Sequence, residues 1–298
     1  MNIYLPIAEM SVNVLVIIGL GGLVGFLSGM FGIGGGFLTT PLLIFYGIPP
    51  AIAVASAATQ ITGSSVSGAL AYWKRGGVDV RIGAVLIAGG VVGAALGSML
   101  FKLLQALGQI DVTINIIYVV FLGTIGGLML REALAALAAQ KAGQVAPTRM
   151  RARNPLVTSL PFKMRYSESG LFISPLAPLL LGVATGILTA IMGIGGGFII
   201  VPALIYVLGM PAKMVVGTSL FQIIFVTAVT TLLHSVQSQT VDIVLAILLL
   251  AGGVIGAQFG VQAAQKLPPE RLRLFLALIV LGVAARVLAG VDAGVAQH

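Results

Sequence analysis

The chain has 298 residues, of which 58% are hydrophobic and 8% are charged, against roughly 25% charged residues in a typical soluble domain. Sixteen Lys and Arg with eight Asp and Glu are too few to cover a soluble surface of this size, and the mean hydropathy of +1.12 agrees. We therefore expect a polytopic integral membrane protein. The net charge of +8 suits basic cytoplasmic loops, so we expect no nucleic-acid partner.

The absence of Cys excludes disulfides, iron–sulfur clusters and zinc–thiolate sites, and two His make a His-based metal centre a poor candidate. We expect no metal and no cofactor. The first ten residues contain Glu9 and neither Lys nor Arg, unlike the basic start of an export signal. The first apolar run is therefore expected to remain as a membrane segment.

Ten apolar segments follow when the chain is divided at Gly, Pro and charged residues, because a spanning helix needs about 20 apolar residues. They are expected at 11–32, 36–47, 51–73, 82–104 and 112–137, and again at 174–192, 197–209, 214–236, 243–265 and 271–291. The predicted organisation is a first transmembrane repeat (1–139), a basic cytoplasmic linker (140–172) and a second transmembrane repeat (173–298). A topology-setting loop is the preferred interpretation of the linker, and binding to acidic lipid headgroups is the alternative.

The two sets of segments are copies of one another. The run Gly32–Phe37 recurs as Gly193–Phe198, and Gly89–Ala94 recurs as Gly252–Ala257, at offsets of 161 to 163 residues. Such matches in the same order indicate an internal duplication.

Charge predicts that the copies have opposite orientation. The loop 73–81 carries three basic residues, whereas its counterpart 235–242 carries none, and the bias reverses in the loop that follows, where 266–273 is basic. Since basic loops stay in the cytoplasm, equivalent loops lie on opposite sides of the membrane. We expect an all-α protein of two inverted-topology repeats, with both termini outside. Whether the short segments cross the membrane or re-enter it stays open.

Each repeat contains a run of three glycines inside an apolar stretch. Three consecutive glycines each cost about 1 kcal/mol of helix propensity relative to Ala, so a break is expected. Secondary transporters place their sites at such breaks, where half-helix N-termini point at anionic groups. We therefore predict that substrate is bound by Gly34, Gly35, Gly36, Gly195, Gly196 and Gly197. Close helix packing is the alternative, and it is preferred for the spaced series Gly21, Gly25, Gly29 and Gly89, Gly93, Gly97.

Polar side chains mark the third segment of each repeat. We predict that some of them line the same substrate site: Ser56, Thr59, Gln60, Thr218, Ser219 and Gln222. The alternative for a hydroxyl is a bond to the carbonyl four residues earlier. It is weaker for Gln60 and Gln222, since a buried amide needs partners for two donors and an acceptor.

Three titratable residues are candidates for proton coupling. Asp79 and Asp242 come directly before apolar runs, where helix capping is the preferred interpretation. His234 lies near the outer end of its segment, where it is either an interfacial residue or part of a proton path.

No pair of residues suits nucleophilic or acid–base catalysis, so we expect no enzyme. Backbone amides, half-helix dipoles, hydroxyls and carboxamides without a fixed counter-charge suit a small oxyanion. Phosphate, sulfonate, sulfite and carboxylate would fit almost equally well.

The sequence resembles the sulfite exporter TauE/SafE family of bacterial membrane transporters, also called toluene sulfonate uptake permeases. The resemblance rests on the two glycine runs with Pro41 and Pro202, on Gly217–Gln222, and on the pairs Gly89-Gly90 and Gly252-Gly253. It implies a secondary transporter in the bacterial inner membrane that exports sulfite, an organosulfonate or a related sulfur-containing anion. An H⁺ or Na⁺ gradient would drive alternating access around a midplane site. A passive anion channel and a transporter of another anion such as a carboxylate are the alternatives, and the oligomeric state stays open.

Overall fold

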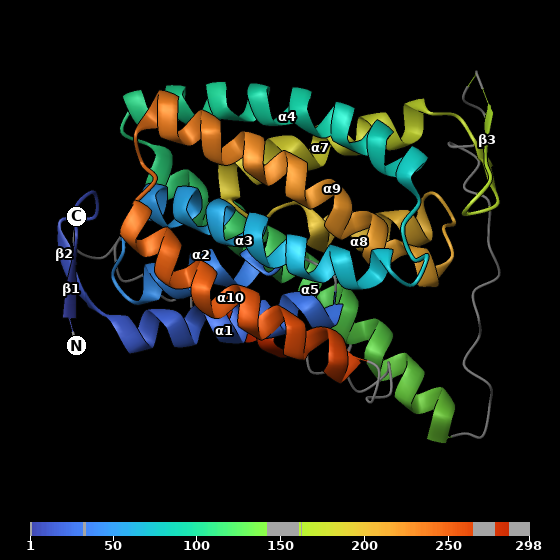
Figure 1. Ribbon diagram of the computed structural model, residues 1–298, viewed down its shortest axis with the longest axis horizontal. Coiled ribbons are helices and arrows are strands. Elements are labelled where there is room, and N and C mark those ends of the chain that lie inside the picture. Colours follow the sequence, from blue (N-terminus) through green and yellow to red (C-terminus); the bar gives the residue numbers. More distant parts are fainter. Residues whose placement is uncertain (1, 32–33, 142–160, 162, 265–277, 286–298) are drawn as a thin grey trace.

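The structure, a computed structural model, describes residues 2–31, 34–141, 161, 163–264 and 278–285. Its helices lie along one long direction, and two short β-hairpins stand at opposite ends of the molecule (Figure 1). The first half contains β1 (Asn2–Leu5), β2 (Met10–Asn13), α1 (Val14–Phe31), α2 (Gly36–Phe45), α3 (Pro50–Trp73), α4 (Val80–Ala106) and α5 (Ile110–Lys141). The second half contains β3 (Met164–Tyr166), β4 (Leu171–Ile173), α7 (Leu176–Met192), α8 (Gly197–Tyr206), α9 (Ala212–Leu233), the π-helical turn η1 (His234–Ser238) and α10 (Ile243–Ala264). Residues 278–285 are also helical.

The expectation of an all-α polytopic membrane protein is confirmed. Among the described residues, five stretches of helix are long and apolar enough to cross a membrane: α1, α4, Ile110–Leu128 of α5, Lys213–Ser238 and α10. For the first nine expected segments, helix ends fall within a few residues of the expected bounds, and both ends of the tenth, 271–291, lie outside the described residues. The largest difference is at α5, which continues to Lys141, and α1 begins at Val14 because the preceding residues form β2.

A β-hairpin precedes the first long helix of each half, and the sequence analysis did not predict either one. β1 pairs antiparallel with β2, and β3 pairs antiparallel with β4. The two turns are alike: Glu9 has φ 52° and Gly170, 161 residues later, has φ 66°. The second hairpin falls within the segment predicted as linker, of which residues 142–160 and 162 lie outside the described part of the chain.

Glycines bring α1 into backbone contact with α10, a helix of the other half. A Cβ added at Gly25 would collide with the carbonyl group of Gly253. The same collision recurs one turn earlier and one turn later, in the pairs Gly21 with Leu249 and Gly29 with Ala257. Because the residue numbers rise together, α1 and α10 run parallel. We call this contact the first glycine seam.

An equivalent contact joins α7 to α4. A Cβ at Gly186 would collide with the carbonyl oxygen of Gly90, and further collisions occur in the pairs Gly182 with Leu86, Gly89 with Leu179, and Gly93 with Val183. This second glycine seam also joins parallel helices. The two seams confirm close packing for both spaced glycine series, as small residues at every fourth position predict.

Through the two glycine seams, each half contributes one helix to the packing of the other half. α10 packs on α1 and α3, and α4 packs on α7 and α9. Eight helices therefore form two units, a first unit (α1, α2, α3 and α10) and a second unit (α7, α8, α9 and α4), and α5 belongs to neither.

The two units meet where α3 crosses α9. Thr62 Oγ1 lies 2.8 Å from Thr227 Oγ1, and Thr59 Oγ1 donates to Thr231 Oγ1 at 3.3 Å. Residue numbers rise along α3 as they fall along α9, so these equivalent helices are antiparallel.

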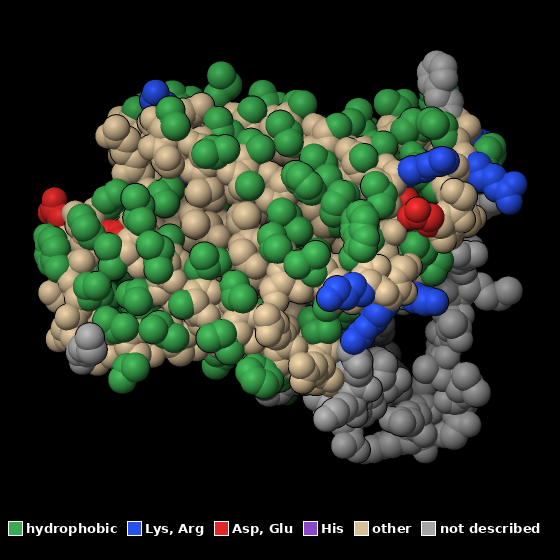
Figure 2. Space-filling model, in the orientation of Figure 1, with side chains coloured by type: hydrophobic (Ala, Val, Ile, Leu, Met, Phe, Trp, Pro, Cys, Tyr) green, Lys and Arg blue, Asp and Glu red, His purple; other side chains and the backbone are tan. Residues whose placement is uncertain are grey.

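Basic side chains gather at one end of the molecule, over the α3–α4 loop and the β3–β4 hairpin (Figure 2). Six exposed Lys and Arg belong to these loops and to the start of α9: Lys74, Arg75, Arg81, Lys163, Arg165 and Lys213. We call this end the basic end. Apolar side chains cover the visible flank between the two ends, as expected for a surface that faces lipid (Figure 2).

Candidate functional site

Both glycine runs break the helical path as predicted. Gly34, Gly35, Gly195 and Gly196 have φ between 70° and 76°, a left-handed conformation that only Gly adopts at low cost. Gly35 and Gly196 are the N-caps of α2 and α8, and each of these helices has only ten residues. The first N–H groups of a helix have no partner within it and carry its positive dipole end.

The starts of the two short helices meet in the interior. The rings of Phe37 and Phe198 stack with centroids 4.7 Å apart and planes at 14°. A Cβ on Gly36 would lie 2.7 Å from the Cα of Ile194. The two breaks, 161 residues apart in sequence, therefore adjoin one another. Residues 32 and 33 lie outside the described positions.

The first polar cluster consists of Ser28, Gly35, Thr39 and Gln60. Gln60 is fully buried, and its Oε1 accepts a hydrogen bond from Thr39 Oγ1 at 3.1 Å. Thr39 Oγ1 also lies 3.4 Å from the Gly35 carbonyl oxygen, which places the amide beside the start of α2. Among the described residues, Gln60 Nε2 and the buried hydroxyl of Ser28 have no hydrogen-bond partner.

The second polar cluster is defined by correspondence with the first: a Cβ at Gly196 would lie 3.0 Å from Thr185 Cβ and 3.2 Å from Thr189 Oγ1, and Gln222 is the counterpart of Gln60 on α9. Gln222 is fully buried, and both its Oε1 and its Nε2 lack partners within the described chain. Ile200 stands where the first cluster has Thr39, so no hydroxyl from α8 reaches this amide. The hydroxyls of Thr185 and Thr189 bond to carbonyls four residues earlier.

Each glutamine packs against a glycine of the helix that comes from the other half. A Cβ at Gly253 would lie 2.6 Å from Gln60 Nε2, and one at Gly90 would lie 3.2 Å from Gln222 Nε2. The paired glycines, which the sequence analysis did not connect with the glutamines, therefore leave the space that the two amides occupy.

The predicted hydroxyl residues lie elsewhere on α3 and α9. Ser56 Oγ accepts the backbone N–H of Asp242 at 3.3 Å, and Thr218 Oγ1 accepts that of Asp79 at 2.8 Å. Ser219 Oγ donates to the Val216 carbonyl at 2.9 Å. The structure thus places Gln60 beside the break before α2, and it places Ser56, Thr59 and Thr218 at contacts between the halves.

Asp79 and Asp242 are buried helix caps that also hold the hairpins. Asp79 Oδ1 accepts the N–H groups of Arg81 and Ile82, and its Oδ2 accepts that of Ser169 at 3.2 Å. Burial and the Asp79 carboxylate both raise the pKa of the nearby Tyr166 phenol, which stays neutral at physiological pH.

Asp242 repeats the arrangement at the opposite end. Its Oδ1 accepts the N–H of Leu245 at 3.1 Å, and its Oδ2 accepts those of Ile7 at 2.9 Å and Ala8 at 3.4 Å. Each carboxylate therefore fixes a hairpin turn to the start of a membrane helix.

His234 is fully buried within the protein. Its Nε2 lies 2.9 Å from the Ala190 carbonyl oxygen, and its ring meets the edge of Phe101 with centroids 4.4 Å apart. It lies outside both polar clusters.

Tyr118 of α5 is a residue that the sequence analysis missed. Its hydroxyl donates to the Met192 carbonyl oxygen at 2.6 Å, and Thr40 donates to the same oxygen at 3.3 Å. The two side chains satisfy a carbonyl that the second break frees from the α7 ladder. A single Tyr in an apolar segment carries no pattern that reveals this contact.

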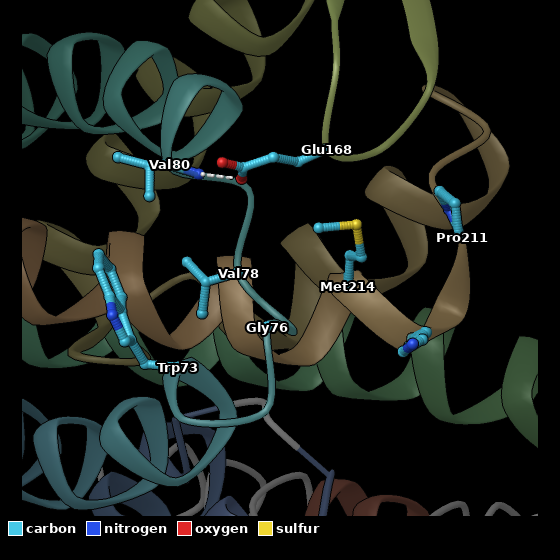
Figure 3. Close-up of a pocket in the computed structure, with 8 residues that line it drawn as sticks. Trp73, Gly76, Val78, Val80, Glu168, Pro211 and Met214 are labelled. Carbon is cyan, nitrogen blue, oxygen red and sulfur yellow. Dashed lines mark hydrogen bonds between the residues drawn. The ribbon is translucent and has the colours of Figure 1, made fainter.

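An open cavity of about 610 Å³ lies at the basic end, apart from the polar clusters (Figure 3). It is bounded by the α3–α4 loop, the β3–β4 turn and the start of α9, and its lining consists of Trp73, Gly76, Val78, Val80, Glu168, Pro211, Lys213 and Met214. Both glutamine side chains have no exposed surface, so neither is open to solvent in this structure.

These features define a polytopic membrane protein of transporter type, with paired broken helices and buried uncharged polar groups at its centre. The family model described as "Sulfite exporter TauE/SafE" matches residues 17–287. The chain belongs to this family of membrane transporters.

Relatives in bacteria agree over nearly the full length. A "Probable membrane transporter protein" of Xylella fastidiosa (strain 9a5c) is 30% identical over 280 residues, covering 93% of this chain and 95% of the relative. The corresponding proteins YjnA and YunE of Bacillus subtilis (strain 168) are 28% and 24% identical, covering 91% and 94% of this chain and 97% and 98% of their own. No solved structure matches the chain.

Proposed function

We propose that this protein is a secondary transporter that exports a small sulfur-containing anion, such as sulfite or an organosulfonate, by alternating access. The observation that carries the proposal is the meeting of two half-helix N-termini at the centre, together with a buried glutamine on α3 and another on α9 whose Nε2 atoms have no partner among the described residues. A buried amide donor without a partner costs free energy, and a bound oxyanion would supply the missing acceptor.

The chemistry of the two clusters favours an anion that binds and then leaves. Helix N-termini attract negative charge through their free N–H groups and their dipole. Neither cluster contains a carboxylate that would repel an anion, or a Lys or Arg that would hold it tightly. The sulfur-containing class follows from the family, whose description names sulfite.

The arrangement of helices supports two inverted repeats as the basis of alternating access. The equivalent helices α3 and α9 run antiparallel, and Figure 1 shows the same reversal between α1 and α7 and between α4 and α10. We propose that the basic end and the 140–172 linker face the cytoplasm of a bacterial inner membrane, that both termini lie outside, and that the repeats occupy residues 1–139 and 173–298.

The packing suggests which bodies move. Each glycine seam holds its two helices in backbone contact, so α1 with α10, and α7 with α4, stay together. The α3–α9 crossing relies on hydroxyl pairs that can be exchanged. We propose that the first and second units rock against each other across this crossing, driven by H⁺ or Na⁺.

Flux in proteoliposomes tests the proposal. Purified protein should accumulate sulfite or a short alkanesulfonate against its gradient when a proton or sodium gradient is imposed. Gly196→Val should abolish flux, because Gly196 has φ 72° and its Cβ position lies 3.0 Å from Thr185 Cβ. Gly19→Val is the matched control, since nothing lies within 4 Å of that position.

Two results would contradict the proposal. Unchanged flux in a correctly reconstituted Gly196→Val protein would remove the helix breaks from the transport path. Equilibration without accumulation under either gradient would indicate a passive channel.

A further inference from the structure

The cavity at the basic end is built at the level where helices leave the membrane. α3 ends at Trp73, and α4 begins at Val80. Trp at a helix end is typical of the membrane–water interface. Most of the lining is apolar, with one cation, Lys213, and one acidic side chain, Glu168.

The acidic residue is engaged with the backbone. Glu168 Oε2 accepts the N–H of Val80 at 3.2 Å, and Figure 3 shows this carboxylate turned toward Val80 and away from Pro211. The positive end of the α4 dipole offsets part of its charge. Lys213 is exposed in the first turn of α9, and the rim carries further exposed bases at Lys74, Arg75 and Arg81.

The opposite end of the molecule, at the β1–β2 hairpin, has the same backbone arrangement but lacks these side chains. At the duplication offset of 161 or 162 residues, Lys213 corresponds to Ala51, Glu168 to Ile7, and Trp73 to Ser235. A hairpin whose turn is bound by a capping aspartate occurs at both ends of the molecule. Lys213 and Trp73 therefore occur at the basic end alone, and the backbone arrangement that the two ends share does not require them.

We propose that this cavity is a second anion site, outside the midplane site, which binds an oxyanion at Lys213 and an attached apolar group against Trp73 and Met214. Two sources share this chemistry: an organic anion that enters from the basic end, and the headgroup of an anionic phospholipid. An acyl chain could lie along an apolar surface beside the cavity, because Trp73 packs against Phe221 with ring centroids 5.7 Å apart, and Phe221 packs against the exposed Phe225 with centroids 5.3 Å apart. The site is independent of the proposed transport mechanism.

Trp73 is the only tryptophan of the chain, so its fluorescence reports on this cavity alone. In purified protein in an uncharged detergent, iodide should quench Trp73 more strongly, relative to neutral acrylamide, than it does in Lys213→Gln. Lys213→Arg should keep the wild-type ratio. Lys102→Gln is the matched control, because Lys102 is an exposed lysine near the end of α4, away from the cavity.

Two ligand titrations distinguish the sources. Protection from iodide by butanesulfonate indicates an organic anion, and protection by dioctanoyl phosphatidylglycerol but not by dioctanoyl phosphatidylcholine indicates a lipid headgroup. In either case the half-saturating concentration should rise about five-fold in Lys213→Gln, as expected for one partly exposed ion pair.

The site does not exist if neither ligand protects Trp73, or if Lys213→Gln leaves the iodide ratio and the titrations unchanged. A flux-deficient Gln222→Leu protein should keep the wild-type titration. Failure of the cavity site and failure of the transport proposal are therefore separate outcomes.

Discussion

The two polar clusters share a backbone and differ in side chains. In each, a left-handed glycine starts a ten-residue helix, and a buried glutamine packs against a glycine of the other half. In the first cluster Thr39 satisfies the Gln60 carbonyl oxygen, whereas in the second Ile200 occupies that position and both polar atoms of Gln222 remain unpartnered among the described residues.

This difference separates what the duplication keeps from what it changes. The glycine seams and the capping aspartates occur in both halves, because backbone contacts tolerate no side chain and exposed helix ends need acceptors. The groups that would touch a solute differ between the halves. Among the described residues, each cluster leaves a glutamine Nε2 donor without a partner, and the second also leaves the Gln222 Oε1 acceptor, which only a solute with an N–H or O–H group would satisfy.

Breaking a glycine seam should have the largest effect. Gly25→Val would drive a branched side chain into the carbonyl group of Gly253, and Gly186→Val would do the same at Gly90. Both variants should fail to yield monodisperse protein in size-exclusion chromatography, whereas Gly19→Val should behave as wild type. A well-folded Gly25→Val protein would show that the seam is not a rigid contact.

Removing the capping aspartates should show that the two hairpin turns are held with different strength. Each loss should cost about 1 to 2 kcal/mol of stability, as for other N-caps. Asp242→Ala removes both contacts to the β1–β2 turn, at Ile7 and Ala8. Asp79→Ala leaves the β3–β4 turn attached through Glu168 and Val80.

Hydrogen exchange measures this difference directly. Protection should fall more in the β1–β2 turn of Asp242→Ala than in the β3–β4 turn of Asp79→Ala. Equal loss of protection in the two turns would show that the Glu168 contact contributes nothing.

Replacing the glutamines should stabilise the protein, whereas most substitutions in a protein core destabilise it. Gln222→Leu removes an amide whose two polar atoms have no partner in the described part of the chain, so the thermal midpoint should rise, by an amount that corresponds to about 1 to 2 kcal/mol. Gln60→Leu should raise it less, because Thr39 loses an acceptor. A lower midpoint for Gln222→Leu would indicate that the amide has partners in the folded protein.

The smallest effect is expected at the crossing of the units. Thr62→Val removes the 2.8 Å contact with Thr227, and hydrogen bonds between membrane helices contribute on average about 0.6 kcal/mol. The thermal midpoint should change little while the transport rate changes several-fold, because this contact must be exchanged when the units move. A fall in stability without a change in rate would place the moving interface elsewhere.

Apolar length, glycine runs and duplicated motifs were sufficient to predict most of the fold. They located the helices to within a few residues, as well as the breaks before α2 and α8. The hairpins were missed because strands of three or four residues carry no periodic signal. The exchange of α4 and α10 between the units was missed because sequence order does not reveal which helices pack together.

Prediction of the site was more limited, for a related reason. Gln60 and Gln222 could be selected because a buried amide needs several partners. Ser56 and Thr218 have the same composition and spacing as a substrate-lining stripe, yet their hydroxyls accept backbone N–H groups from the other half. Only the three-dimensional contacts between halves distinguish these roles.

The most direct test of the central claim is the shift in thermal midpoint that sulfite or a short alkanesulfonate produces in wild-type protein and in Gln222→Leu. We expect a concentration-dependent rise in the wild type, and in Gln222→Leu a higher starting midpoint with no rise and no flux. A Gln222→Leu protein that is stabilised by the same anion to the same extent, and that still transports it, would contradict the assignment of the buried amides as the anion site.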